Sequence, residues 1–494
     1  MIFLRKNAEK NINNVINEEE RIKGSLYGFF VGDALGVPVE FLNRGVLSNK
    51  PIKQMEEYGT HNQPKGTWSD DSSMLLATID SMYSNKELLL TDKIINYNDL
   101  MMKFSNWKNN AEYTPNNNVF DIGISTSTAI SKFEKSNNPF SGDNNINSNG
   151  NGSLMRILPV SIFTHYCIHS TYAGTIKDDF YNLVKNVSSV THSHDLSIMA
   201  CMIYTYFVDN YIELLDVKRT YDRTRNHFKN IFEGRINKDY GDKELYKKYF
   251  NRLIYNDIST LKLNDIKSSG FAIDSLEATL WCILTTNSFK EATLKAVNLG
   301  DDTDTIGALT AALAGLIYGV DSIPTDWINS LQRKDYLDEM VKKYLELISY
   351  RKNQNDIERK NAINEYMNER KEHRMIKATK DSWKTLPMTE NVKELEVDID
   401  LSNEDIELIK LGHVPFEMED HWFMYFDDDD NTINYYRSWS GLPVFKGYLN
   451  IEKNKIYKLV ISLEKEVYSE NKIYDDIVNQ FKRMIENEIK CHNK

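Results

Sequence analysis

Two clusters of oxygen-bearing side chains each precede a stretch of apolar residues at helical spacing. The first is Ser-Asp-Asp at residues 69–71, and the second is Asp-Asp-Thr-Asp-Thr at residues 301–305. Neighbouring carboxylates repel one another unless a cation is present, and carboxylate and hydroxyl oxygens are the ligands that hard divalent cations prefer. Two such helix starts that face each other could share one or two ions of Mg²⁺, Mn²⁺ or Ca²⁺.

Helix capping is the simpler explanation of both clusters. A helix N-terminus favours negative charge, and Ser and Asp are favoured N-cap residues. Capping needs one such side chain, whereas each cluster contains more than one. The repetition of the pattern therefore favours a metal site.

Composition limits the class of protein. The chain has 494 residues, 41% of them hydrophobic, which is enough for a large core and for two to four domains. Its net charge of −12, with no basic run, makes a charge-driven nucleic-acid partner unlikely. The four cysteines are scattered without a CxxC pair, which excludes a zinc ribbon and a disulfide framework and fits a reducing compartment.

No apolar run is long enough to span a bilayer, and residues 1–10 lack the apolar core of a signal peptide. We therefore expect a cytoplasmic protein with no membrane partner. The periodicity predicts an all-α domain over residues 21–349, a charged helical linker over 350–396 and a small α+β domain over 397–494. In the last domain we expect strands at 421–426, 432–439, 442–449 and 455–463, the first two joined as a hairpin, and a closing helix at 472–489.

Five segments of the first domain, in this order, resemble the motifs of the ADP-ribosylglycohydrolase family, whose members are all-α hydrolases with two magnesium ions. The resemblance covers roughly residues 21–331. The segments are residues 24–40 (GSLYGFFVGDALGVPVE), 66–72 (GTWSDDS), 120–123 (FDIG), 149–156 (NGNGSLMR) and 269–278 (SGFAIDSLEA), the last leading into residues 298–307.

The resemblance implies two Mg²⁺ ions, with Mn²⁺ as an alternative, and six ligands. The ligands implied are Ser69, Asp70, Asp71, Asp302, Asp304 and Thr305. The family usually has Thr where this chain has Ser69, and either residue supplies a hydroxyl oxygen. Many members have Gly where Asp301 stands, so we expect Asp301 to lie behind the ligands or at the surface.

The resemblance also implies catalytic and substrate-binding residues. Glu40 and Asp121 are implied as the general base or acid, and the sequence does not rank them. The residues implied in substrate binding are Phe120, Gly123, Gly150, Asn151, Gly152, Ser153 and His192. Closely spaced glycines let backbone N–H groups approach a pyrophosphate, although residues 149–152 could be only a turn. His192 could equally be a structural histidine.

Three further side chains have structural interpretations. We expect Asp33 to cap the turn of its own Gly-Asp-Ala-Leu-Gly segment and Arg156 to pair with a buried acid. The aromatic residues of the predicted hairpin are expected in a core rather than on a recognition surface. They are Trp422, Tyr425, Tyr436 and Trp439.

The function that the resemblance implies is a Mg²⁺-dependent ADP-ribosyl glycosidase. It would remove ADP-ribose from a protein side chain or other acceptor, including a small molecule, through a dinuclear metal site. The alternative is an ADP-ribose-binding or toxin-neutralising immunity protein on the same fold, which would occlude an ADP-ribosylating toxin. Intact ligand clusters favour the enzyme. The sequence does not identify the linkage, the oligomeric state or the role of the C-terminal domain.

Overall fold

The computed structural model describes residues 16–90, 95–168, 176–236, 240–418, 420–464 and 474–492. The expectation about a signal peptide concerns residues 1–10, which lie outside the described residues. The chain divides into two compact units, residues 1–356 and 357–494, each with a hydrophobic core of its own. The first unit is helical and the second contains a sheet, so the predicted fold class is confirmed.

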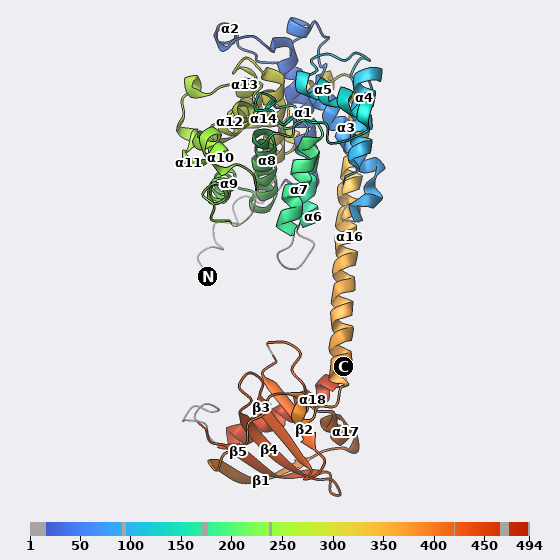
Figure 1. Ribbon diagram of the computed structural model, residues 1–494, viewed down its shortest axis with the longest axis vertical. Coiled ribbons are helices and arrows are strands. Elements are labelled where there is room, and N and C mark those ends of the chain that lie inside the picture. The colour runs from blue at the N-terminus through green and yellow to red at the C-terminus, as the bar shows by residue number, and fades with distance from the viewer. Residues whose placement is uncertain are drawn as a thin grey trace. The chain divides into compact units, whose positions relative to one another are not determined.

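The first unit is a layered assembly of helices around a central antiparallel pair, α1 and α14 (Figure 1). The helices are α1 (Glu18–Gly36), α2 (Arg44–Asn49), α3 (Asp70–Ser84), α4 (Tyr97–Asn110), α5 (Ile124–Ser136), α6 (Leu158–Ile168), α7 (Ile176–Ser189), α8 (Asp195–Leu214), α9 (Val217–Phe232), α10 (Lys243–Tyr249), α11 (Asn251–Tyr255), α12 (Ala272–Leu284), α13 (Phe289–Val297), α14 (Thr303–Tyr318), α15 (Thr325–Ser330) and α16 (Lys334–Arg374).

A stripe of glycines brings α1 and α14 into backbone contact. Gly24, Gly28, Gly32 and Gly36 recur every four residues, which places them on one face of α1. A Cβ atom at Gly32 would lie 2.2 Å from the carbonyl oxygen of Gly307, and a Cβ at Gly36 would lie 2.3 Å from the Cα of the first-turn aspartate of α14. The absence of side chains along this stripe therefore fixes where the N-terminus of α14 lies.

Helix α16 belongs to both units. It begins in the first unit, where Leu337, Tyr344 and Leu347 are buried, and it continues through most of the expected linker to Arg374. The next regular strand, β1, begins at Val392, before the expected end of the linker at residue 396. The limits of a separate linker thus stay a prediction.

The second unit is a five-stranded antiparallel sheet with two helices. Strands β2 and β3 form the predicted hairpin, in which Trp422 is paired with Arg437 and Asp427 with Thr432. The sheet order is β1-β5-β4-β3-β2, and helices α17 and α18 pack their apolar residues into the core of this unit (Figure 1). The bounds are β1 (Val392–Asp400), α17 (Asn403–Leu411), β2 (Trp422–Asp427), β3 (Thr432–Arg437), β4 (Pro443–Asn450), β5 (Lys455–Ser462) and α18 (Tyr474–His492).

The aromatic residues of the hairpin divide between core and surface. Tyr425 and Tyr436 are buried, as predicted. The prediction is wrong for Trp439, which is 61% exposed because it follows the end of β3 in the turn before β4. Trp422 is partly exposed at one end of the edge strand β2, and the guanidinium of Arg437 lies 4.3 Å from its ring centroid.

The hydropathy of the described helices differs from that of membrane-spanning helices. Among the described residues, no helix combines the length and the apolar character that crossing a bilayer requires.

Candidate active site

The first predicted metal cluster lies at the N-terminus of α3. Ser69 is the N-cap residue, and its hydroxyl accepts a hydrogen bond from the Asp71 N–H at 3.2 Å. Asp33, from α1, accepts hydrogen bonds from the Ser69 N–H at 2.9 Å and from the N–H and hydroxyl of Ser72 at 3.0 and 2.6 Å. The prediction that Asp33 caps its own segment is therefore wrong, because its carboxylate caps α3 instead. Neither Asp70 nor Asp71 is needed as the cap.

The second predicted cluster lies at the N-terminus of α14. Asp302 is at the N-cap position, yet its side chain makes no capping hydrogen bond. Its carboxylate instead accepts a hydrogen bond from the side-chain amide of Asn151 at 2.8 Å. The hydroxyl of Thr305 donates to Asp71 at 3.4 Å, which links the two helix starts. Both clusters thus point their oxygens into one shared region.

Five carboxylates meet in that region. Oxygens of Asp33, Asp71 and Asp304 lie within 4.8 Å of one another, and so do oxygens of Glu40, Asp302 and Asp304. Burial raises the pKa of Asp71 and of Asp304 well above the ordinary value, and the neighbouring carboxylates raise both further. The protein alone therefore disfavours full ionisation of this group.

The donor set fits a hard divalent cation. Asp71 Oδ2 and Asp304 Oδ2 are buried and have no hydrogen-bond partner among the described residues. A buried carboxylate oxygen without a partner is costly unless a cation neutralises it. Asp70, which is 5% exposed, adds a further carboxylate, and the hydroxyls of Ser69 and Thr305 add neutral oxygens. Residues of this kind would hold Mg²⁺ or Mn²⁺.

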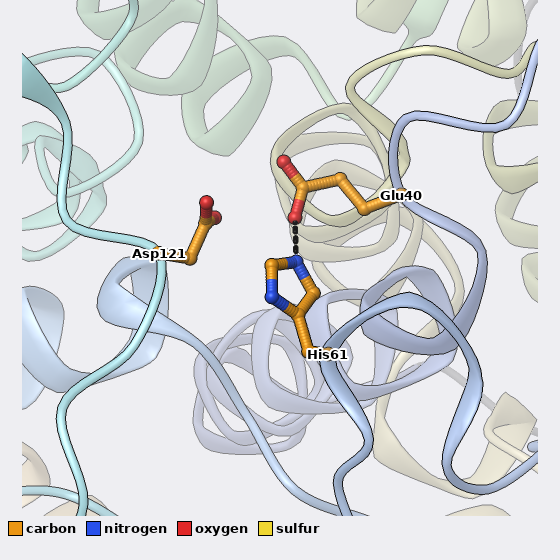
Figure 2. A group of neighbouring side chains, drawn as sticks. All are labelled: Glu40, His61 and Asp121. Carbon is orange, nitrogen blue, oxygen red and sulfur yellow. Dashed lines mark hydrogen bonds and ion pairs between the residues drawn. The ribbon is translucent and has the colours of Figure 1, made fainter.

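A histidine lies between the two predicted acid–base residues. His61 Nε2 lies 2.5 Å from Glu40 Oε2, and Asp121 faces the same imidazole from a separate coil segment (Figure 2). Ligand atoms of the three residues lie within 4.8 Å of one another. Burial raises the pKa of Glu40 to about 8, although the bond to His61 opposes this shift. The same hydrogen bond raises the pKa of His61.

The segment that follows α4 forms the rim of the site. The ring of Phe120 lies 5.1 Å from the ring of His61, centroid to centroid, and the ring of Phe41 lies 5.8 Å from it. Phe41 is 64% exposed. Gly123 is exposed at the N-cap position of α5. This part of the site therefore combines aromatic rings with carboxylates.

The glycine loop at residues 149–152 is fixed against the start of α12. The Asn151 N–H donates to the Gly270 carbonyl at 3.0 Å, and the Ala272 N–H donates to the Asn149 carbonyl at 3.0 Å. Gly150 forms an isolated bridge with Phe271. The loop lies beside the group of carboxylates because the side-chain amide of Asn151 donates to Asp302 and also to Ser275, the latter at 3.0 Å.

Two residues expected to bind substrate are buried next to this loop. Ser153 is 1% exposed and accepts a hydrogen bond from Ser188 at 2.9 Å. His192 is 2% exposed, and a Cβ atom at Gly152 would lie 2.8 Å from its Cε1. Burial, and then the charge of Arg156, lower the pKa of His192 to about 3. Their direct contact with a substrate stays a prediction.

Arg156 does not have the acidic partner that the sequence suggests. It is fully buried, and its guanidinium donates to the Val187 carbonyl at 3.0 Å and to the Thr191 hydroxyl at 2.7 Å. The ring of Phe104 lies 4.9 Å from the guanidinium carbon. The expected pairing with a carboxylate is therefore wrong, because neutral oxygens and an aromatic face surround the charge.

Sequence reasoning misses one side chain of the site and places another correctly. His61 lies in a segment with no periodicity, and nothing in the sequence connects it to Glu40, from which helix α2 and two loops separate it. The pairing depends on tertiary structure alone. Asp301 is exposed and accepts a hydrogen bond from Ser268 at 3.0 Å, so the expectation that it is not a ligand agrees with its position.

A helical unit that gathers carboxylates from two helix N-termini beside a glycine loop agrees with the class that the sequence motifs resemble, hydrolases that act on ADP-ribosyl bonds. Comparison with known proteins supports this class. The sequence profile of the family described as ADP-ribosylglycohydrolase matches residues 14–354. The chain belongs to that family, and it is an ADP-ribosyl glycosidase, which removes ADP-ribose from a substrate.

Two relatives illustrate the likeness. An ADP-ribosylarginine hydrolase of Serratia proteamaculans is 28% identical over 324 residues, which cover 65% of this chain and 78% of the relative. An ADP-ribosyl-[dinitrogen reductase] glycohydrolase of Rhodospirillum rubrum is 28% identical over 330 residues, or 64% of this chain and 91% of the relative.

A solved structure shares the fold of the first unit. It is described as an ADP-ribosylglycohydrolase-related protein complex, with a TM-score of 0.52 and 22% sequence identity. The match covers 67% of this chain and all of that chain.

Proposed function

We propose that this enzyme removes ADP-ribose from arginine side chains of proteins and that it depends on two Mg²⁺ ions, with Mn²⁺ as a substitute. The proposed ligands are Ser69, Asp70, Asp71, Asp302, Asp304 and Thr305. The observation that supports the metal site best is the pair of buried, unpartnered oxygens, Asp71 Oδ2 and Asp304 Oδ2, one from each helix start.

The chemical problem is to replace a nitrogen or oxygen on the anomeric carbon of ribose with a hydroxyl group from water. Divalent ions held by the six ligands would supply positive charge that polarises the ribose hydroxyls and lowers the pKa of water. We assign Glu40 as the general base, because its carboxylate reaches both Asp302 and Asp304 within 4.8 Å. Glu40 would take a proton from the attacking water while the bond from the anomeric carbon to the acceptor nitrogen breaks. The electron pair of that bond leaves with the guanidine nitrogen, and the released guanidine then takes up the proton.

Asp121 lies nearer to solvent than Glu40 and is the better candidate to contact the acceptor. An arginine acceptor carries a guanidinium group, which carboxylates attract and aromatic rings stabilise through cation–π contact. The rim supplies both kinds of group, because Asp121 and the rings of Phe41 and Phe120 all lie near the imidazole of His61. The names of two relatives, ADP-ribosylarginine hydrolases of Serratia proteamaculans and Pseudomonas putida, favour the same acceptor.

The glycine loop is the proposed site for the pyrophosphate. Gly150 has no side chain, and a Cβ atom there would be in ordinary contact with His192 Nε2 at 3.7 Å and with the Gly270 carbonyl oxygen at 3.8 Å. The absence of side chains at Gly150 and Gly152 is what would let a phosphate come close to the backbone of this loop. The buried side chains of His192 and Ser153 would pack against this loop and hold its backbone in place.

The second unit contributes none of the proposed ligands, so its proposed role is the choice of protein partner. An ADP-ribosylating toxin is one such partner. The buried free thiols of Cys201 and Cys282 suit a reducing compartment, which supports the cytoplasmic location expected from the sequence.

Incubation with a panel of ADP-ribosylated substrates tests the function. The panel contains Arg-linked, Ser-linked and nucleic-acid-linked ADP-ribose and O-acetyl-ADP-ribose, each with Mg²⁺, with Mn²⁺ and with EDTA. We expect release of free ADP-ribose from the Arg-linked substrate, loss of release in EDTA and recovery when Mg²⁺ is restored. Release that is unchanged by EDTA would contradict the metal proposal. Binding of ADP-ribose without turnover of any substrate would favour the occlusion role.

A further inference from the structure

Residues 58–63 form a tight turn whose backbone is unusual. Tyr58 and Gln63 are bridged by hydrogen bonds of 2.6 and 3.3 Å, and the short 3-10 helix Gly59–His61 lies between them. Tyr58, Gly59 and Asn62 all have positive φ, at 63°, 55° and 52°. Positive φ is disfavoured for Tyr, so the surroundings must hold this conformation.

The turn is attached to the Glu40 segment at three points. The Thr60 hydroxyl donates to the Glu40 carbonyl at 2.7 Å, and His61 Nε2 bonds the Glu40 carboxylate at 2.5 Å. Gly59 packs so closely on Pro38 that a Cβ atom would lie 1.9 Å from the Pro38 carbonyl oxygen. These contacts fix both the backbone and the side chain of Glu40.

The same turn is attached to the Asp121 side of the site. The Gln63 side chain accepts a hydrogen bond from the Asn116 amide at 2.8 Å, in the segment that leads to Phe120 and Asp121. The imidazole of His61 lies between the rings of Phe41 and Phe120. The turn therefore connects the two acid–base residues, which come from distant parts of the sequence.

We propose that the 58–63 turn is a positioning element of the active site and that His61 is the positioning residue for Glu40. This inference rests on the proposed role of Glu40 as general base. A carboxylate has two oxygens, and Figure 2 shows Glu40 with one oxygen on His61 and the other directed away from the imidazole. The bond to His61 thus selects the rotamer that leaves the second oxygen free to accept a proton from water.

The hydrogen bond does not depend on the charge of His61. When Glu40 is ionised, as a base must be before it takes a proton, Nε2 is the donor. Nε2 carries a hydrogen in the imidazolium and in one of the two neutral tautomers. His61 is therefore assigned a geometric role, with no proton transfer of its own.

The test compares substitutions that separate the hydrogen bond from ring packing. His61→Phe keeps an aromatic ring between Phe41 and Phe120 but removes the donor. His61→Gln keeps an N–H near the position of Nε2. We expect His61→Phe to lower kcat about 10²-fold, as misplaced groups do, with little change in KM, and His61→Gln to recover most of the loss. His227→Phe, at a histidine of α9 whose ring stacks on Tyr206 of α8, is the matched control and should leave kcat unchanged.

A double-mutant cycle with Glu40→Gln tests whether His61 acts through Glu40. If it does, adding His61→Phe to Glu40→Gln lowers kcat no further. Circular dichroism checks folding, and Thr60→Val, which removes the other hydrogen bond to Glu40, replaces His61→Phe if that variant does not fold. We expect Thr60→Val to lower kcat as well.

Four outcomes are decisive. A folded His61→Phe enzyme with wild-type kcat overturns the proposal, and so does wild-type kcat in Thr60→Val if His61→Phe does not fold. Additive losses in the double mutant overturn the action through Glu40. If Glu40→Gln itself keeps full activity, Glu40 is not the general base. That result would contradict the proposed function and not only the role of His61.

Discussion

Asp302, a proposed metal ligand, occupies the N-cap position of α14 without capping the helix. Asp33 is the opposite case, since hydrogen bonds from Ser69 and Ser72 occupy both of its oxygens. The two residues are chemically identical, and only their surroundings distinguish them.

We predict that Asp302→Asn lowers turnover at least about 10²-fold, because it removes one proposed metal ligand. The same change should raise the Tm measured in EDTA, because it removes one charge from a group of buried carboxylates that repel one another. Thermal unfolding with EDTA and with Mg²⁺ checks both effects. Wild-type activity, or a lower Tm in EDTA, would show that Asp302 is a structural residue.

At the scale of elements, the contact between α1 and α14 positions the site. Gly32→Ala places a methyl group against the Gly307 carbonyl, whose oxygen would lie only 2.2 Å from the new Cβ atom. Overpacking of a core costs about 1–3 kcal/mol, and backbone at the point of contact cannot move aside easily. We expect a loss of at least about 2 kcal/mol in the free energy of unfolding.

Gly45→Ala is the matched control for this prediction. A Cβ atom at Gly45, in the short helix α2, would lie 3.2 Å from Oδ1 of Asn43, the N-cap residue of that helix. Only the end of this side chain has to shift, and Ala has the higher helix propensity, so we expect Gly45→Ala to change stability much less than Gly32→Ala. Urea denaturation of both variants measures the difference. Equal stabilities would mean that α1 and α14 can separate without cost.

The second unit contains an ion-paired group that links α18 to the loop after α17. Glu488, which is 8% exposed, lies 3.5 Å from His413 and 3.1 Å from His492. Burial favours the neutral form of Glu488, but the two histidines outweigh it and lower its pKa. Burial also disfavours the charge of His413, and the bond to Glu488 outweighs it and raises the pKa of His413.

These directions predict how stability depends on pH. The contribution of Glu488 to the stability of the second unit is fully present above the ordinary pKa of Glu488, 4.5, and is lost as the pH falls. The contribution of His413 is fully present below its ordinary pKa of 6.5 and is lost as the pH rises. Glu488→Gln should therefore destabilise the second unit most between these values, by about 3 kcal/mol. Hydrogen exchange of α18 amides measures the effect, and an equal loss at pH 5.5 and pH 9 would contradict the pairing.

The elements that the sequence predicts well are those whose pattern is local. The β2–β3 hairpin follows from alternating aromatic residues around an acidic turn, and α14 follows from its apolar spacing. Strand β1, Val392–Asp400, is missed because its side chains are largely charged and it is an edge strand. The acidic clusters are predictable because their residues are adjacent, whereas His61 and Asp33 depend on contacts between distant segments.

At the scale of the whole molecule, every proposed site residue lies in the first unit. We predict that a chain ending at Asp356 folds and hydrolyses a small ADP-ribosylated peptide at a rate comparable to that of the full protein. A chain ending at Tyr350 should be less stable, because it lacks Lys352, which pairs with Glu18 at 2.9 Å, and Asn355, which donates to the Tyr166 carbonyl at 2.6 Å.

Circular dichroism and turnover of both truncated chains test this division. A folded chain ending at Asp356 that has lost all turnover on the peptide would show that the second unit completes the active site. Loss of activity on a protein substrate alone would instead support a role of the second unit in partner choice.

The glycine stripe of α1 also determines which changes of length this helix tolerates. One residue inserted between Gly24 and Gly36 would displace the following residues by about 1.5 Å and turn them by about 100° around the axis. Part of the stripe would then face away from α14, and Asp33 would no longer reach α3. An insertion of four residues turns the following residues by about 400°, or slightly more than one full turn, and keeps the glycines near one face. We therefore expect deletions and insertions in α1 to be tolerated only in steps close to a whole turn, although the helix itself would form with any of them.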